Sequence, residues 1–576
     1  MPSSNTLEFL LFSGEYNAVL ERTAASQALS EMPAMVGALA LSGRLDEAES
    51  AFARLTGTSG VDPEFLAQAR FFVVAGLCHA GRIPRALRVA QETLPQVRGG
   101  DSRRRFWACQ GFALIRYFQG RFHLARRFAR RALNAAIECA FPYARFLALD
   151  LCAHISVQTG EVFAGLRLME QAQALADALG YQANAATLRV MRTVYELRFL
   201  VRPVDEAIQR ATQTLDSEGV SYFGRRNGLI ELANMQTLRG HFAAAQETLE
   251  SARRIALPGN DRRGKTRWAL AMALYAALVQ GEGAEHLEVA RASGSEELML
   301  QAELAFVEAV FFPELARAHS EEIAKLAVRT GIQRARVAAT FATQAPIANT
   351  LGVEDGLSRA LLQCHERSEP ARRVQSIVET GLLGLLPWAL GRAPSQRIVV
   401  TASSVLSETS RGITLAELPS RPSLRVLFAL REGYQSRERL LESIWGITRF
   451  VPQRHVPVLH TAVSRLRVAL GDGEWVLTLD DGYSLASDVE VLDLGGLHVP
   501  GAPATSPPPP PSDAERVLEY LRNNSNSSSS DVATALSISA SAALRLLRRL
   551  TEEGEVTRQG GGRSTRYSLA PPKEAS

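Results

Sequence analysis

The first two thirds of the chain carry a helical pattern of apolar and polar positions. Residues 1–390 are rich in Ala, Leu, Arg and Glu, and the alternation of apolar and polar residues typical of strands is almost absent. A phrase recurs there as GRLDEAESAFARL from Gly43, GRIPRALRVAQETL from Gly81 and GRFHLARRFARRAL from Gly120. Fainter copies begin at Gly160 and Gly240, so the steps are 38, 39 and 40 residues and then two of 40. The pattern predicts a series of paired helices.

Each part of the recurring phrase has a physical reason. The glycine ends one helix in a left-handed turn, and the next helix starts within two or three residues. A small residue five positions later lets the paired helices approach closely, as at Ala48, Ala86, Ala125 and Ala245. RPVDEAIQRATQTL, from Arg202, fills the missing copy without the glycine. Period and spacing resemble a tetratricopeptide (TPR) array with a longer repeat than usual.

Such a TPR-like α-solenoid implies a concave surface that holds a ligand. We therefore expect residues 1–395 to be a sensor or interaction domain for an unknown peptide, protein or small-molecule ligand. The alternative is a spacer or dimerisation arm, which leaves a homodimer open.

The pattern changes at Arg397. Short β-type runs extend to Leu418, and three helices are expected next: SLRVLFALREG from Ser423, SRERLLESIWG from Ser436, and a third from Pro457 to Leu470. Ser436 suits an N-cap, and Pro457 suits the first position of a helix. The strands WVLTL and YSLA follow.

SRERLLESIWG, AVSRLRVALGD and GYSL, in this order, resemble the OmpR-type winged-helix domain of bacterial transcription regulators, over residues 396–489. The resemblance implies that the third helix enters the major groove of double-stranded DNA. It assigns Thr461, Ser464 and Arg465 to groove contacts, and Arg454 and Arg467 to phosphates. It also implies that the loop GITRFVPQRHV contacts RNA polymerase.

The hairpin of this segment departs from the family. The family commonly places an arginine or lysine in the hairpin, but this chain has Asp480 and Asp481 there. Carboxylates repel phosphates, so either the hairpin makes no contact with DNA or it faces a protein.

A linker with seven prolines lies within residues 490–512 and predicts an extended tether. The following residues, 513–570, resemble the small winged-helix modules of bacterial repressors and activators. Six arginines and three acidic residues lie between Arg545 and Tyr567, as expected of a surface that binds phosphates. The predicted DNA contacts are Ser541, Arg545, Arg548, Arg563 and Arg566.

One literal nucleotide-binding motif, GNDRRGKT at Gly259–Thr266, lacks the strand that such a loop follows, because the preceding residues are helical. An inter-helix turn is therefore expected. No nucleophile motif is present and the cysteines share no CxxC spacing, so we expect no enzyme activity, no cofactor and no metal site. His455 and His460 are five residues apart without a cysteine or carboxylate partner nearby.

The net charge and the lengths of the apolar runs agree with a DNA-binding protein that does not span a membrane. The net charge is only +4, so any affinity for nucleic acid has to come from local patches. The longest apolar run, Trp268–Val279, has twelve residues and is too short to span a bilayer. We expect a cytoplasmic bacterial protein without membrane contact. The predicted fold is mainly α, with a TPR-like α-solenoid followed by two winged-helix (α+β) domains. The predicted function is DNA-binding transcriptional regulation, and the alternative is a scaffold whose winged helices dock proteins.

Overall fold

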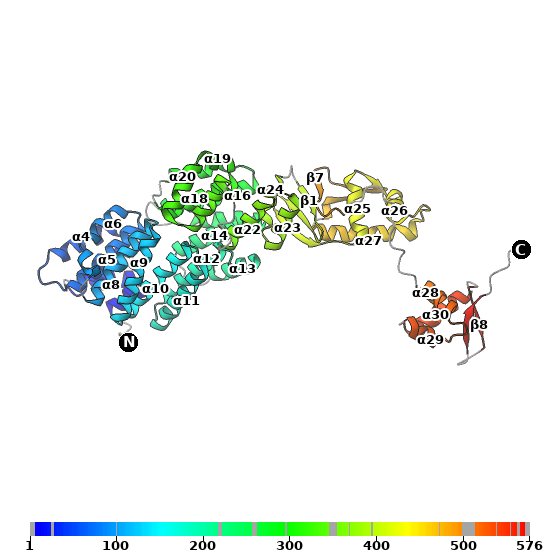
Figure 1. Cartoon of the computed structure of the whole chain (residues 1–576), viewed down its shortest axis with the longest axis horizontal. Coiled ribbons are helices and arrows are strands. Elements are labelled where there is room, and N and C mark those ends of the chain that lie inside the picture. Colours follow the sequence, from blue (N-terminus) through cyan, green and yellow to red (C-terminus); the bar gives the residue numbers. More distant parts are fainter. Residues whose placement is uncertain are drawn as a thin grey trace. The chain divides into compact units, whose positions relative to one another are not determined.

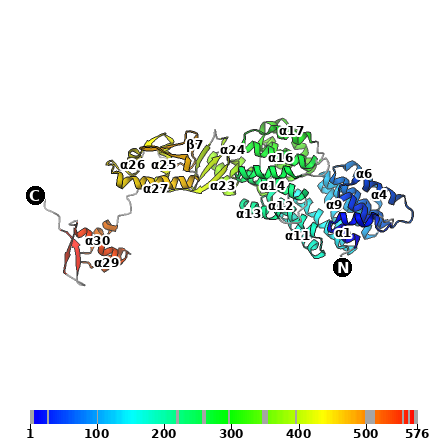
Figure 2. The same ribbon diagram turned by 180° about the vertical axis from the view of Figure 1, so that it is seen from behind.

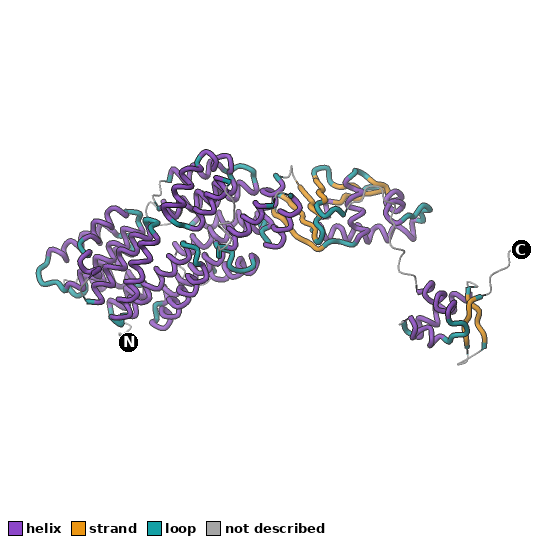
Figure 3. Tube along the Cα trace, viewed as in Figure 1, coloured by secondary structure: helices purple, strands orange, loops and turns teal. Residues whose placement is uncertain are grey.

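The computed structural model is mainly helical with a few small sheets, as Figure 3 shows. It describes residues 6–24, 28–98, 101–216, 222–255, 262–293, 297–344, 354–367, 369–392, 396–471, 473–497, 513–536, 538–552, 555–560 and 565–570. The chain divides into two compact units. One comprises residues 1–434, 462–479 and 483–497, and the other comprises residues 435–461, 480–482 and 498–576.

The first unit starts with helices that pack against their neighbours in sequence. In Figures 1 and 2 helix α14 lies beside α12 and beside α16, and it contacts both. The recurring phrases form the second helices of such pairs. The helices up to residue 292 are α1 (Leu7–Ser13), α2 (Tyr16–Thr23), α3 (Met32–Leu41), α4 (Leu45–Gly57), α5 (Pro63–His79), α6 (Ile83–Gln91), α7 (Leu94–Arg98), α8 (Ser102–Phe118), α9 (Phe122–Glu138), α10 (Pro142–Gln158), α11 (Val162–Leu179), α12 (Gln182–Arg198), α13 (Val204–Leu215), α14 (Tyr222–Arg239), α15 (Phe242–Arg254), α16 (Arg262–Val279) and α17 (Ala284–Ala292).

The helical pattern continues beyond the clear repeats. The remaining helices of this region are α18 (Leu298–Phe311), α19 (Pro313–Ala318), α20 (Ser320–Thr330), α21 (Gln333–Thr343), α22 (Gly356–Glu366), α23 (Pro370–Thr380), the 3-10 turn η2 (Leu383–Leu385) and α24 (Leu386–Leu390).

The predicted turn between paired helices is confirmed. All five repeat glycines have positive φ, from 64° at Gly120 to 96° at Gly160. The four predicted small residues, Ala48, Ala86, Ala125 and Ala245, are fully buried.

The copy without glycine also makes a left-handed turn. Leu200 takes it up, with φ 46°, and it lies 40 residues after Gly160 and 40 before Gly240. A side chain in this conformation costs roughly 1–2 kcal/mol. The repeat geometry therefore persists where its sequence signal is lost.

A four-stranded sheet follows the helices in the order β3-β2-β1-β7. Its strands are β1 (Gln396–Val400), β2 (Ser404–Thr409), β3 (Gly412–Glu417) and β7 (Val489–Asp493). β1 pairs antiparallel with β2 and parallel with β7, with Ile398 opposite Val491. The linker predicted for residues 490–512 therefore begins too early, because residues 490–493 complete β7. Strand pairing across more than 90 residues left no local signal.

The other elements of residues 396–493, the middle segment, are α25 (Arg421–Arg431), β4 (Gln435–Ser436), α26 (Arg437–Trp445), α27 (Pro452–Leu470), η3 (Gly473–Trp475), β5 (Val476–Thr478) and β6 (Gly482–Leu485). The second sheet has the order β4-β6-β5. The C-terminal domain, residues 513–570, contains α28 (Asp513–Asn523), α29 (Ser529–Leu536), α30 (Ala540–Glu552), β8 (Val556–Gln559) and β9 (Arg566–Leu569).

The four-stranded sheet shares one hydrophobic core with the helices before it. Val399, Leu406 and Ile413 belong to the same buried cluster as Leu382 and Leu385. The backbone N–H of Ile413 donates to Gly240 O at 2.8 Å, and a Cβ on Gly384 would lie 1.9 Å from Thr237 O. The predicted boundary at residue 395 is therefore a packed junction within one unit.

A cluster of charged side chains lies on this sheet. Arg397 on β1 lies 2.8 Å from Glu490 and 3.4 Å from Glu408, whose side chain is 7% exposed. Burial, more than the neighbouring Glu490, raises the pKa of Glu408 to about 6 against the opposing effect of Arg397. The folded state thus binds this proton more tightly than the unfolded chain does.

We expect Glu408 to make the folded state about 1 kcal/mol more favourable at pH 5 than at pH 7. A carboxyl whose pKa is higher in the folded state than in the unfolded chain stabilises the fold as pH falls through the folded pKa toward the unfolded pKa. Glu408→Gln removes this gain. Urea unfolding of the two proteins at pH 5 and pH 7 measures it. Parallel pH profiles for both proteins would contradict the expectation.

Candidate nucleic-acid interface

The C-terminal domain has its own small core. Val517 of α28, Val532 of α29, Leu547 of α30 and Tyr567 of β9 belong to one buried cluster. Tyr567 also exchanges two backbone hydrogen bonds with Ser527, of 2.8 and 3.1 Å. This core holds α30 on the other elements by one face and leaves its opposite face in solvent.

One face of α30 packs against the rest of the domain. Leu547 and Leu550 are buried. Leu544 is half-buried and packs against the same hydrophobic core. The hydroxyl of Ser539 accepts a hydrogen bond from Ala542 N at 3.2 Å, which satisfies a free donor at the start of the helix.

Three of the predicted DNA contacts share the exposed face of α30. Ser541, Arg545 and Arg548 follow the i, i+4, i+7 spacing that lines one side of a helix, and all three are exposed. No ion pair involves Arg545 or Arg548 within the described part of the chain, so both guanidinium groups are available to an anion. This face has two positive charges and a small polar group near its N-terminal end.

The hairpin of the C-terminal domain places two further arginines. Arg558 on β8 is exposed. Arg566 on β9 forms an exposed ion pair with Asp531 at 3.2 Å. Hydrogen bonds from Ser528, and secondarily Arg566, lower the pKa of Asp531. Arg566 is thus tied to the start of α29, whereas Arg563 lies outside the described residues.

The helices of the middle segment begin close to the predicted positions, with one exception. The hydroxyl of Ser436 caps α26 by accepting from Arg439 N at 3.2 Å, as expected. The third helix begins at Pro452, however, and Pro457 lies inside it. The ring of His455 accepts a hydrogen bond from Val451 N at 3.1 Å, and Val451 O accepts from His455 N.

These contacts explain the early start of α27. They cap the helix at Val451, and Pro452 then occupies its first position. The missing N–H of Pro457 frees Gln453 O, and Gln453 is exposed to water. The loop expected to contact polymerase is correspondingly shorter, because its last five residues are helical.

Four of the five predicted contacts in α27 point to solvent. Arg454, Thr461, Ser464 and Arg465 are exposed, although the Thr461 hydroxyl donates to Pro457 O at 2.8 Å. Two apolar side chains of the same helix are also exposed, Val458 at 43% and Val468 at 79%. The exposed face of α27 is therefore mixed in character.

Arg467 differs from the other four. Its guanidinium donates to Val476 O at 3.1 Å through Nε and to Thr478 Oγ1 at 2.7 Å. It ties α27 to β5 and is half-buried. Since the Val476 carbonyl belongs to a fully buried residue, the immediate role of Arg467 is to hold the hairpin. Asp480 and Asp481 at the hairpin tip are exposed.

The phosphate-loop interpretation can be compared with the structure for Arg262–Thr266 only, since residues 256–261 lie outside the described part. Arg262–Thr266 begin helix α16, and the element before the loop is helix α15. The expected helical context is confirmed.

Within the described residues, no group of three His, Cys, Asp or Glu side chains is placed to hold a metal ion. The helices described are all too short or too polar to cross a membrane.

Comparison with known proteins agrees with the geometry at the C-terminus. No curated protein matches the chain. Residues 514–557, which run from α28 into β8, match the family described as winged helix-turn-helix DNA-binding. The chain thus carries a winged helix-turn-helix DNA-binding domain at its C-terminal end.

Proposed function

We propose that this protein is a bacterial transcriptional regulator that binds double-stranded DNA through α30. The supporting observation is that Ser541, Arg545 and Arg548 are exposed on one face of α30. This helix lies in the part of the chain that matches a DNA-binding family. In such domains the second helix of the motif enters the major groove, where arginines contact bases and phosphates. A protein that acts on the chromosome of a bacterium works in the cytoplasm.

The middle segment is a second winged helix of OmpR type in this proposal. Its support is the order of leading strands, three helices and a hairpin, together with the exposed Thr461, Ser464 and Arg465 on α27. The helical region, residues 6–390 as described, is the TPR-like sensor. The packed junction at Gly240 and Ile413 supports a sensor that acts directly on the middle segment.

A second candidate function is a scaffold in which the middle segment docks a protein, including RNA polymerase. Val458 and Val468 are exposed on α27, and Asp480 and Asp481 occupy the hairpin. Exposed apolar side chains and exposed carboxylates each suit a protein surface better than a polyanion.

Selection of the full chain on a random duplex pool, followed by binding across a salt series, separates the two functions. Regulation predicts enrichment of one sequence and an affinity that falls steeply with salt, because cations are released from the phosphates. Arg465→Ala tests the middle segment, since loss of sequence preference at a few base pairs identifies a contact to bases. Absence of enrichment together with salt-independent binding would reject the regulator and favour the scaffold.

A further inference from the structure

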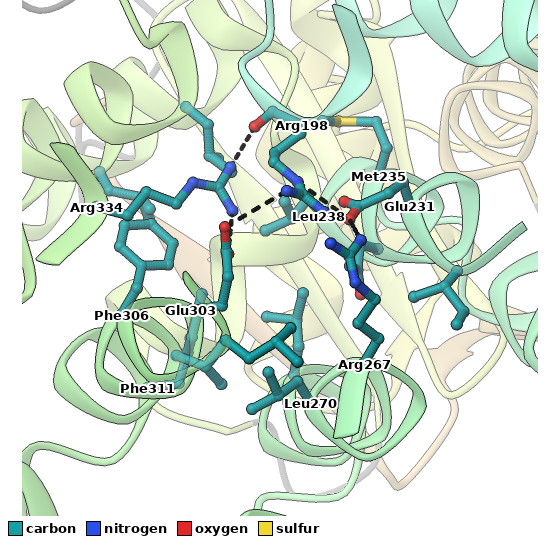
Figure 4. Close-up of a pocket in the computed structure, with 17 residues that line it drawn as sticks. Arg198, Glu231, Met235, Leu238, Arg267, Leu270, Glu303, Phe306, Phe311 and Arg334 are labelled. Atoms are coloured by element: carbon teal, nitrogen blue, oxygen red, sulfur yellow. Dashed lines mark hydrogen bonds and ion pairs between the residues drawn. The ribbon is translucent and has the colours of Figure 1, made fainter. Parts of the chain in front are cut away.

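The helical region contains a pocket lined by charged side chains from five helices. Arg198 ends α12, and Glu231, Arg267, Glu303 and Arg334 belong to α14, α16, α18 and α21. Figure 4 shows these groups gathered around one part of the pocket, with Leu270 and Phe311 on another side. The volume open to the centres of water molecules is about 60 Å³. A cavity needs roughly 10–15 Å³ of occupied volume to hold one water, so this pocket has room for several waters.

Two of the three arginines are held by protein groups. Arg198 forms ion pairs with Glu231 and, at 3.6 Å, with Glu303. Arg334 lies 2.6 Å from Glu303 and donates to the backbone carbonyl of Arg198. Its guanidinium also lies 4.9 Å from the centre of the Phe306 ring. Asp355 lies 3.7 Å from Arg334 and accepts hydrogen bonds from Ser358.

Arg267 has a much weaker set of partners. Its side chain is 14% exposed, and Glu231, already paired with Arg198, lies 3.8 Å away. Among the described residues, no hydrogen-bond acceptor meets Arg267 Nε. Burial, with the positive charges of Arg198 and Arg263, lowers the pKa of Arg267 to about 10. A buried cation normally requires a close anionic partner, because its desolvation is costly.

The rest of the lining suits a short apolar group. Leu270, Leu274, Leu300, Phe306 and Phe311 line the pocket. Asn234 also lines it, and its buried Oδ1 has no hydrogen-bond partner among the described residues. An apolar wall beside a weakly paired guanidinium is the arrangement that binds a small amphipathic anion.

We propose that this pocket binds a small organic monoanion, a carboxylate with a short apolar tail, whose carboxylate pairs with Arg267. The small volume of the pocket favours a short ligand. The single poorly paired cation favours one negative charge. This inference names a ligand class for the sensor region of the proposed function. The regulatory role of the ligand rests on that proposed function, whereas binding of the ligand to the pocket does not involve DNA.

One helix connects the pocket with the middle segment. Glu231, Asn234 and Leu238 on α14 line the pocket, and Thr237 and Gly240, at the end of the same helix, pack against Gly384 and Ile413. A ligand that moves α14 therefore acts on the packed junction, through contacts within one unit.

The test uses the purified full chain and three acids: butyrate, pentanoate and benzoate. Their amides, butyramide, pentanamide and benzamide, match them in shape and lack the charge. Isothermal titration should give a Kd of about 0.1–1 mM for at least one acid, within the range of ligands of this size. Each corresponding amide should bind at least tenfold more weakly, since a bond between charged groups is lost. Thermal melting at ten times the Kd should rise by about 1–2 °C.

Arg267→Gln should weaken binding of the acid tenfold or more, whereas Arg262→Gln serves as the matched control. Arg262 is exposed on the same helix and does not line the pocket. Equal binding of acid and amide, or unchanged affinity in Arg267→Gln, would overturn the anion site. Failure of all three acids to bind the wild-type chain at 10 mM would overturn it too, whatever the folding of the variant. DNA binding does not enter these measurements, so failure of the regulator proposal remains distinguishable.

Discussion

Replacing both Arg545 and Arg548 with alanine should weaken binding of the full chain to duplex DNA by about 10- to 100-fold at low salt. Both side chains are exposed on α30, on the face opposite the buried Leu547 and Leu550. Alanine favours the helix at both positions, so the fold of the C-terminal domain should be retained. Each lost phosphate contact should also reduce the slope of log affinity against log salt by about 0.9.

Fluorescence anisotropy with a labelled duplex across a salt series measures both effects. Arg522→Ala is the control, because Arg522 is exposed in the same domain but lies in the last turn of α28. The control should leave affinity and salt slope nearly unchanged. Unchanged affinity in the double variant would mean that α30 does not contact DNA, and the middle segment would then carry the binding.

Gly384→Ala should cost about 3–5 kcal/mol of stability in the first unit, or prevent the folded chain from accumulating. A Cβ at this position would lie 1.9 Å from Thr237 O and 3.0 Å from Leu238 C and O, all backbone atoms of α14. A rotamer change cannot relieve contact with backbone, so η2 and α14 have to separate. The sheet would lose part of its shared core, because Leu383 and Leu385 belong to the same cluster as Ile413.

Gly57→Ala provides the comparison for this loss. Gly57 ends α4, and an added Cβ would meet no atom within 4 Å. Its effect should stay within about 0.5 kcal/mol. Urea unfolding followed by circular dichroism reports both variants. Equal midpoints for the two would show that helices and sheet are not packed as one unit.

Local sequence was enough to predict most helices and their turns. Each turn between paired helices favours a glycine with positive φ and a buried alanine five residues later. Because both preferences are local, the pattern can be read from the sequence, as at Gly43 and Ala48. The Ser436 cap is local in the same sense. The winged helix at the C-terminus was predicted from a resemblance to known modules, and its core comes from a short stretch of chain.

Tertiary structure decided the features that join distant residues. β7 pairs with β1 across more than 90 residues, and Leu200 adopts a left-handed conformation that its own side chain disfavours. Arg467 is drawn to the hairpin, although its position on α27 had suggested a phosphate contact.

The pocket around Arg267 was likewise invisible in the sequence, since its five charged residues are spread from Arg198 to Arg334. The periodic pattern of apolar residues reflects only the local requirements of helices and turns. The environment of a buried charge depends on which helices pack against one another, and that is set by the burial of the whole core.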